Sequence, residues 1–167
     1  EYDCITEENM KLLMRKLPEA KEVLQFLLAR YGKLRRLMTE PSFTLTYNDF
    51  HWTNFAVRKD KKAAMMFDYN LLGRGYRFSD FSNVCWGLSE KAKDAFKTEY
   101  GRLYLEKHGH ARTEAEEQER RVDAVAAPLF ALFTAETRHE NEPDWAGGIK
   151  HEATDGTLLA KAKQLLL

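Results

Sequence analysis

The chain has 167 residues, of which 44% are apolar and 31% are charged, so its composition excludes a disordered segment and suits one domain with a hydrophobic core. Lys plus Arg and Asp plus Glu each number 26, and this balance argues against a nucleic-acid partner or an anionic membrane surface. No apolar run approaches the roughly 20 residues that span a bilayer, so we expect no membrane partner.

The two cysteines, Cys4 and Cys85, have neither the spacing of a metal site nor the pattern of a disulfide framework. They predict reduced thiols in a cytoplasmic protein. The first residues, EYDCITEEN, lack the basic and apolar parts of a signal peptide. They also lack an initiator methionine, so we expect a processed product or a fragment of a longer protein.

Residues 1–40 are predicted to be helical. Thr6, followed by two acids, indicates the start of a first helix. Pro18 suits the first turn of a second helix, which Pro41 is expected to end. One apolar stripe at helical spacing runs along this second helix and consists of Ala20, Val23, Leu24, Leu27, Leu28, Tyr31 and Leu34.

Short strands around a polar loop are predicted for residues 43–68. Apolar and polar residues alternate over residues 43–47, which indicates a strand. After the loop, residues 55–57 and 63–67 are expected to pair as a hairpin, with the charged run RKDKK as its exposed turn.

From Ser79 to the end, over residues 79–167, the pattern is helical. Ser89 is predicted to cap a helix, and Thr113 with Glu116 forms a capping box for a long one. Thr154 or Asp155 is expected to begin the last helix. The core face of the helix after Ser89 is predicted to be Ala92, Ala95, Phe96, Tyr100 and Leu103. The fold class is therefore mostly α with a small β-hairpin insert.

Three residues stand in a chemically informative order. Asp49 is followed five residues later by Asn54, and Asp68 comes at the end of the predicted hairpin, in MMFDYN. A loop aspartate, an asparagine, a hairpin and a second aspartate form the layout that kinases use for phosphoryl transfer. There, the first aspartate accepts the proton of the attacking hydroxyl. The amide oxygen and the second aspartate hold Mg²⁺, a hard cation that prefers oxygen ligands.

The segments YNDFHWTNFAV and MMFDYN resemble the catalytic loop and the metal-binding aspartate of the aminoglycoside phosphotransferase/choline kinase-like family. The family pattern is approximately His-Gly-Asp-x-His-x-x-Asn, an apolar strand, and then apolar-apolar-Asp-aromatic. The resemblance is sharp over residues 43–86, and it implies that residues 1–167 are the helical C-terminal lobe of a protein-kinase-like fold. It also implies Mg²⁺ as cofactor and ATP as phosphoryl donor. The implied acceptor is a hydroxyl of a small molecule, namely an aminoglycoside-like compound, an amino alcohol or a sugar.

By this resemblance, Asp49 is the catalytic base, and Asn54 and Asp68 are the metal ligands. His51 matches a histidine that often follows the catalytic aspartate by two residues, and it is a candidate for a substrate or loop contact. Asp80, in FSDFSN, matches an aspartate that begins a helix and hydrogen-bonds the catalytic loop, so we expect it to support the loop.

The sequence departs from the family pattern in several ways. Tyr47 and Asn48 replace the His-Gly that precedes the catalytic aspartate. No strand is predicted before residue 43, so we expect a kinase's N-terminal nucleotide-binding lobe to be missing from these residues, and this missing lobe is an expected partner. Gly73 and Gly75 follow Asp68 and do not suit a phosphate cradle. We therefore expect the isolated chain to be inactive.

Five further residues are candidates for contacts with the substrate. Trp52 either packs with the neighbouring aromatic residues or lines an acceptor pocket. Glu136, Glu140, Glu142 and Asp144 lie together in AETRHENEPDWAGG. In the resembled family, acids in this region hold cationic acceptors, whereas the alternative is a solvated acidic loop.

Three functions are compatible with these residues. The leading hypothesis is an ATP-dependent phosphotransferase that acts on a small-molecule hydroxyl, present here as its C-terminal lobe. An alternative is a non-catalytic kinase-like binding or regulatory module, which the departures at Tyr47 and Asn48 favour. A Mg²⁺-dependent hydrolase that uses the same acids is the third possibility.

Overall fold

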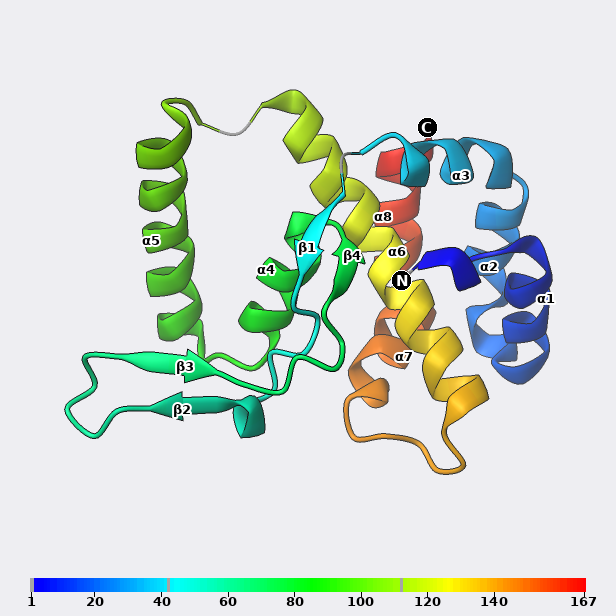
Figure 1. Cartoon of the computed structure of the whole chain (residues 1–167). Coiled ribbons are helices and arrows are strands. Elements are labelled where there is room, and N and C mark those ends of the chain that lie inside the picture. Colours follow the sequence, from blue (N-terminus) through cyan, green and yellow to red (C-terminus); the bar gives the residue numbers. More distant parts are fainter. Residues whose placement is uncertain (1, 42, 112) are drawn as a thin grey trace. The chain divides into compact units, whose positions relative to one another are not determined.

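The computed structural model describes residues 2–41, 43–111 and 113–167, except for the side chain of Trp52. It is mostly helical, as predicted, and it contains two small antiparallel sheets (Figure 1). The chain divides into two compact units. The first unit comprises Glu1–Pro41 and Gln118–Leu167, and the second comprises Ser42–Glu117.

The first unit is built from helices. They are α1 (Glu7–Lys16), α2 (Lys21–Leu28), α3 (Tyr31–Thr39), α7 (Ala146–Thr154), α8 (Thr157–Leu166) and α6 (Glu114–Arg138) from Gln118 onward, with the short 3₁₀ helices η1 (Tyr2–Cys4) and η2 (Pro18–Ala20). Helix α2 packs against α1 and α8, and α7 packs against α8 (Figure 1). Leu24, Leu27 and Leu158 are fully buried between these helices. The Tyr2 hydroxyl also donates a 2.7 Å hydrogen bond to the buried carboxylate of Asp123.

Helix α1 begins as predicted, because the Thr6 hydroxyl accepts a hydrogen bond of 3.1 Å from the backbone N–H of Asn9. The predicted second helix is wrong, because it is interrupted between α2 and α3. Arg30 leaves the helical conformation with φ −126° and ψ 20°, and its N–H donates to the Leu27 carbonyl at 3.0 Å. The apolar stripe gave no sign of this break, since both Leu27 and Leu34 are buried.

The C-terminal helices also differ from the prediction. Helix α7 lies partly within the segment that we expected to be a loop. The last helix begins at Thr157, after Gly156 in the left-handed conformation (φ 92°), and not at Thr154 or Asp155. The Asp155 carboxylate nevertheless accepts a 2.8 Å hydrogen bond from the Thr157 N–H, so it satisfies a donor at the start of α8.

The second unit contains both sheets. Its elements are β1 (Thr44–Thr46), the 3₁₀ helix η3 (Trp52–Asn54), β2 (Phe55–Val57), β3 (Ala64–Met66), β4 (Gly73–Gly75), α4 (Arg77–Trp86), α5 (Glu90–His108) and the first residues of α6. Strands β2 and β3 form the predicted hairpin, with Phe55 opposite Met66 and Val57 opposite Ala64 (Figure 1). Strand β1 pairs with β4, which the sequence did not predict.

Helix α5 begins after Ser89, whose hydroxyl accepts from the Ala92 N–H at 3.4 Å, as predicted. Its predicted core face is partly wrong, because Ala95 and Leu103 are exposed. Phe96 and Tyr100 of this helix contact Phe81 of α4, with ring centroids 5.4 and 4.9 Å apart.

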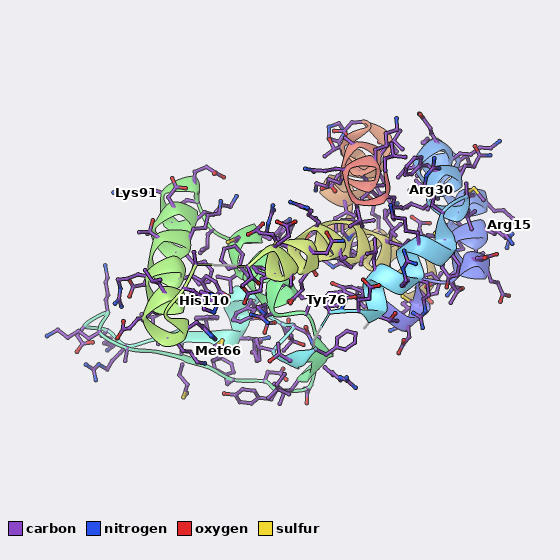
Figure 2. All side chains as sticks on the ribbon, turned by 90° about the horizontal axis from the view of Figure 1, so that it is seen from above. Arg15, Arg30, Met66, Tyr76, Lys91 and His110 are labelled. Carbon is purple, nitrogen blue, oxygen red and sulfur yellow. The ribbon has the colours of Figure 1, made fainter. Side chains whose placement is uncertain are left out.

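Charged side chains such as those of Arg15 and Lys91 are exposed and extend away from the ribbon (Figure 2). Among the helices of the described residues, none combines the length and apolar composition that crossing a bilayer requires.

Candidate active site

The polar loop between β1 and η3 is held at its start by Asp80, which lies in the first turn of α4. The two carboxylate oxygens of Asp80 accept hydrogen bonds of 2.8 Å from the backbone N–H groups of Tyr47 and Asn48. Asn48 has φ 64°, a left-handed conformation that asparagine tolerates better than most residues. These contacts determine the direction in which the chain enters Asp49.

Asp49 and Asn54 face each other across a short turn. The Asn54 side-chain Nδ2 donates to Asp49 Oδ2 at 2.7 Å and to the Asp49 carbonyl at 3.3 Å. Asn54 is only 8% exposed. Because a carboxylate can only accept hydrogen bonds, this contact identifies which atom of the amide is Nδ2. Oδ1 of Asn54 accepts a long hydrogen bond of 3.4 Å from the Thr53 hydroxyl and is the amide atom that could coordinate a cation.

Asp68 is placed beside this turn by the hairpin. The backbone N–H of Phe67 donates to the Asn54 carbonyl at 3.1 Å, so the residue before Asp68 is tied to Asn54. Asp68 itself is exposed and has φ 64°, a left-handed conformation that is uncommon outside glycine but that aspartate, like asparagine, adopts more readily than most residues. Such backbone outliers cluster at functional sites, so this conformation supports a functional hypothesis for Asp68.

The negative charges of Asp49 and Asp68 both act on the Tyr47 phenol. The phenol ring is buried, and its hydroxyl donates to the Phe67 carbonyl. Burial raises the pKa of the Tyr47 phenol, and the negative charges of Asp49 and Asp68 raise that pKa further. Both effects favour the neutral phenol, which donates its hydrogen bond to the Phe67 carbonyl.

The donor set of the loop fits Mg²⁺. Asn54 and Asp68 offer amide and carboxylate oxygens, which hard divalent cations prefer. Within the part of the chain that the structure describes, no group of three or more His, Cys, Asp or Glu side chains could hold a metal. This pair of oxygen ligands suits Mg²⁺, which usually keeps several waters and binds substrate phosphates. It does not suit a closed zinc site.

Two other loop residues were candidates for substrate contact. The ring of His51 is exposed, and its Nδ1 lies 2.8 Å from the Thr53 hydroxyl, so a loop contact is present. Trp52 belongs to η3, but its side chain lies outside the described residues, and its predicted contact stays a prediction.

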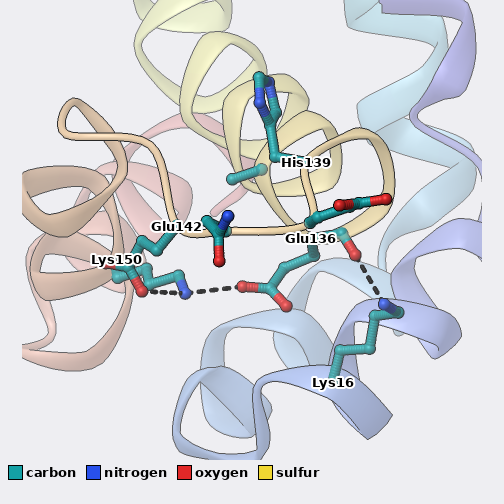
Figure 3. Close-up of a pocket in the computed structure, with 8 residues that line it drawn as sticks. Lys16, Glu136, His139, Glu142 and Lys150 are labelled. Carbon is teal, nitrogen blue, oxygen red and sulfur yellow. Dashed lines mark hydrogen bonds and ion pairs between the residues drawn. The ribbon is translucent and has the colours of Figure 1, made fainter.

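The predicted acidic cluster lies in the first unit, where an open pocket of about 220 Å³ follows the end of α6 (Figure 3). Glu136, Glu140 and Glu142 all line it, whereas the exposed Asp144 does not. Lys150 of α7 pairs with Glu136 at 2.8 Å and with Glu142 at 2.7 Å, as the dashed lines in Figure 3 show. The hydrogen bonds that Lys150 donates to these two acids raise its pKa, and its positive charge partly neutralises the cluster.

The sequence gave no signal for Lys150, which is 14 residues after Glu136 and on another helix. Lys16 of α1 was also missed. Its Nζ donates to the Glu136 carbonyl at 2.6 Å and so satisfies a carbonyl group in the last turn of α6 (Figure 3).

The sequence of the chain is similar to one known protein family over most of its length. Residues 5–129 match the phosphotransferase enzyme family, and this match includes the whole polar loop, the hairpin and Asp80. No curated protein and no solved structure gave a significant match to the chain. The match covers most of the chain, and it extends well beyond the segment that carries the motif.

The loop and the family match together define the class of the protein as a kinase-like phosphotransferase. The chain belongs to the phosphotransferase enzyme family, which is the family that the motif in residues 45–68 indicated.

Proposed function

We propose that this protein is an ATP-dependent kinase that phosphorylates a hydroxyl of a small molecule, with Asp49 as the base and Asn54 and Asp68 as the ligands of Mg²⁺. The observation that carries the proposal is the 2.7 Å hydrogen bond between Asp49 and Asn54, with Asp68 following the hairpin that returns to Asn54. Members of this family generally use ATP and Mg²⁺, which supports the same cofactors here.

The proposed chemistry follows from the residues of the loop. Asp49 Oδ2 is engaged by Asn54, so its second carboxylate oxygen is free to orient the acceptor hydroxyl and to take its proton. As the acceptor oxygen bonds to the γ-phosphorus, the bond to the β-phosphate oxygen breaks and ADP leaves. When bound, Mg²⁺ would neutralise the negative charge on the phosphates. Asp80 would support this geometry through the backbone of Tyr47 and Asn48.

We further propose that the acids after α6 contact a cationic group of the acceptor. Glu136 and Glu142 share Lys150, whereas the carboxylate of Glu140 has no ion pair among the described residues. Among the three acids that line the pocket, Glu140 therefore has a charge that no described ion pair balances. If the proposal is right, replacing Glu140 and Glu142 with Gln should raise the KM for a cationic acceptor and leave the KM for ATP unchanged.

We also propose that the chain acts as the C-terminal lobe of a kinase-like fold and that a second lobe, from residues outside 1–167, covers the hairpin. The second unit exposes several large apolar side chains, and this supports the proposal. Single exposed apolar residues are normal, but a group of them is typical of a surface that another part of a protein covers. Val57 and Met65 of the hairpin are 62% and 63% exposed, and Leu45 of β1 is 70% exposed.

The experiment that tests the proposed activity is an acceptor screen with the complete natural protein, Mg²⁺ and ATP. We expect ADP to form only in the presence of an aminoglycoside, an amino alcohol or a sugar, with a phosphate monoester of that compound visible by ³¹P NMR. Formation of inorganic phosphate without any acceptor would indicate hydrolysis. Absence of turnover with every acceptor would favour a binding or regulatory module.

A further inference from the structure

Two consecutive residues before Asp49 make side-chain contacts with the segment that carries Asp68. The Tyr47 hydroxyl donates to the Phe67 carbonyl, and Asn48 Nδ2 donates to the Leu71 carbonyl at 3.0 Å. One contact is directly before Asp68 and the other is three residues after it. The two hydrogen bonds therefore bracket Asp68 and link it to the residues that precede Asp49.

The segment around Asp68 lies between two strands and exposes most of its side chains. Strand β3 ends at Met66 and β4 begins at Gly73. Between them, the side chains of Phe67, Tyr69 and Leu71 are exposed, so packing alone does not hold the backbone. The Asp68 carboxylate accepts a long hydrogen bond of 3.4 Å from the Asn70 N–H, which is a weak restraint.

Tyr47 and Asn48 are well anchored themselves. Their backbone N–H groups both donate to Asp80, and the Tyr47 ring is buried against Phe50 and Tyr69 with centroids 5.0 and 5.7 Å apart. Asn48 leaves its buried Oδ1 without a hydrogen-bond partner among the described residues. A buried acceptor without a partner is unfavourable. The asparagine side chain at this left-handed position therefore has a cost at Oδ1, which points to a use for its Nδ2 group.

We propose that Tyr47 and Asn48 are positioning residues that form a two-point clamp and set the place of Asp68 relative to Asp49. This inference rests on the proposed function of Asp68 as a metal ligand. It gives the replacement of His-Gly by Tyr-Asn a specific role, since a glycine at position 48 has no side chain to reach the Leu71 carbonyl. Transfer of a phosphoryl group requires the base and the metal ligand in one geometry, so the clamp is expected to act on turnover.

Three variants of the complete protein isolate the clamp. Tyr47→Phe removes the hydroxyl and keeps the buried ring, and Asn48→Gly removes the amide where glycine accepts the backbone angle. Tyr69→Phe is the matched control, because the Tyr69 hydroxyl donates to the Met66 carbonyl at 2.9 Å within the Asp68 segment. The control therefore loses a bond of the same type that does not connect the two segments.

The first measurement is amide hydrogen exchange in the metal-free protein. We expect exchange at Phe67 and Leu72, whose N–H groups donate to Asn54 and Tyr69, to become about tenfold faster in Tyr47→Phe and in Asn48→Gly. Tyr69→Phe should leave the exchange at Phe67 unchanged. Unchanged exchange at both amides in both clamp variants would overturn the clamp.

The second measurement is Mn²⁺ binding followed by electron paramagnetic resonance, with Asp68→Asn as the reference. We expect Asp68→Asn to abolish tight Mn²⁺ binding and each clamp variant to weaken it about tenfold, with kcat lowered and the acceptor KM unchanged. Wild-type Mn²⁺ affinity in both clamp variants, with binding lost in Asp68→Asn, would overturn the clamp and leave the proposed function standing. Wild-type affinity in Asp68→Asn would overturn the proposed role of Asp68, on which the clamp depends.

Discussion

The carboxylate of Asp80 accepts two short hydrogen bonds from consecutive backbone N–H groups, and the loop that contains Asp49 begins at this contact. A single carboxylate can satisfy both donors because each of its oxygens accepts one bond. In an asparagine, one of these positions becomes an NH₂ group, which cannot accept a hydrogen bond and which repels the facing N–H.

Asp80→Asn should therefore lower both stability and activity. We expect the free energy of unfolding to fall by about 2 kcal/mol, as for the loss of a hydrogen bond to a charged group, and kcat to fall more than the KM values rise. Urea unfolding and steady-state kinetics of the complete protein measure the two effects. Asp94→Asn, at an exposed position on α5, is the control and should change neither. Equal behaviour of the two variants would show that Asp80 does not support the loop.

At this scale, the sequence was informative about side chains and uninformative about their backbone partners. Asp49, Asn54 and Asp68 could be selected because their residue types and their order match the layout that kinases use for phosphoryl transfer. Tyr47 bonds to the carbonyl of Phe67, and a backbone carbonyl is the same at every residue. No sequence pattern can therefore indicate which carbonyl, 20 residues away, receives the hydroxyl.

Glu116, in the first turn of α6, connects the helices of the second unit. Its carboxylate accepts hydrogen bonds from Tyr104 of α5 and from the Thr113 N–H at 2.6 Å, and it pairs with Arg77 of α4 at 2.8 Å. Burial opposes the charge of Glu116. The hydrogen bonds from Tyr104 and Thr113 and the charge of Arg77 nevertheless lower its pKa to about 2.

The lowered pKa of Glu116 predicts a specific pH dependence of stability. The folded protein binds the proton of this carboxyl less readily than the unfolded chain, whose value is near 4.5, so ionised Glu116 stabilises the fold above that pH. This stabilisation should decrease as the pH falls from about 4.5 and be lost near pH 2. The difference in unfolding midpoint between wild type and Glu116→Gln should shrink accordingly when urea unfolding is repeated from pH 6 down to pH 2.

The control for this prediction is Glu106→Gln, which removes an exposed ion pair with Arg102 on α5. Exposed pairs contribute little, so this variant should stay close to wild type at every pH. A constant difference between wild type and Glu116→Gln over the whole range would contradict the role assigned to Glu116.

Elements with local signals were predictable, and elements that depend on distant partners were not. The caps at Thr6 and Ser89 and the capping box of Thr113 and Glu116 all form, because each is a contact between residues three apart. Strand β4 consists of Gly73, Arg74 and Gly75, and glycine is depleted in strands. Strand β4 forms because β1 pairs with it. Thr46 lies opposite Gly73, 27 positions later in the chain, so this strand depends on a distant partner.

Helix α7 was missed for a related reason. It contains Gly147 and Gly148 in its first turn, and glycine disfavours a helix by about 1 kcal/mol relative to alanine. Burial of Ala146 and Ala153 and packing against α8 offset this cost. Tertiary contacts thus decide the structure of a segment whose local sequence favours a loop.

For the whole molecule, the family match spans parts of both compact units, so the membership does not depend on the loop alone. The four described strands carry no lysine, and the glycines of β4 follow Asp68 and do not open a phosphate-binding turn. A lysine on a strand and a glycine-rich turn are the features with which kinases hold the nucleotide phosphates. The nucleotide is therefore expected to depend on residues of the proposed second lobe.

This dependence predicts that residues 1–167 alone bind ATP weakly. Calorimetric titration with MgATP should give a dissociation constant above about 1 mM, which corresponds to less than about 4 kcal/mol of binding free energy. A protein that extends beyond residues 1–167 and includes the second lobe should bind at least tenfold more tightly. Micromolar binding by residues 1–167 would contradict the proposed division of the site.

The most direct test of the account is the effect of Asp49→Asn on the complete protein with its best acceptor. We predict that kcat falls by about 10²- to 10⁴-fold, the range for loss of a general base, while the dissociation constant for MgATP stays within about twofold. Asp60→Asn, in the exposed hairpin turn, should keep full activity. Turnover by Asp49→Asn close to that of the wild type would contradict the assignment of this loop as the catalytic site.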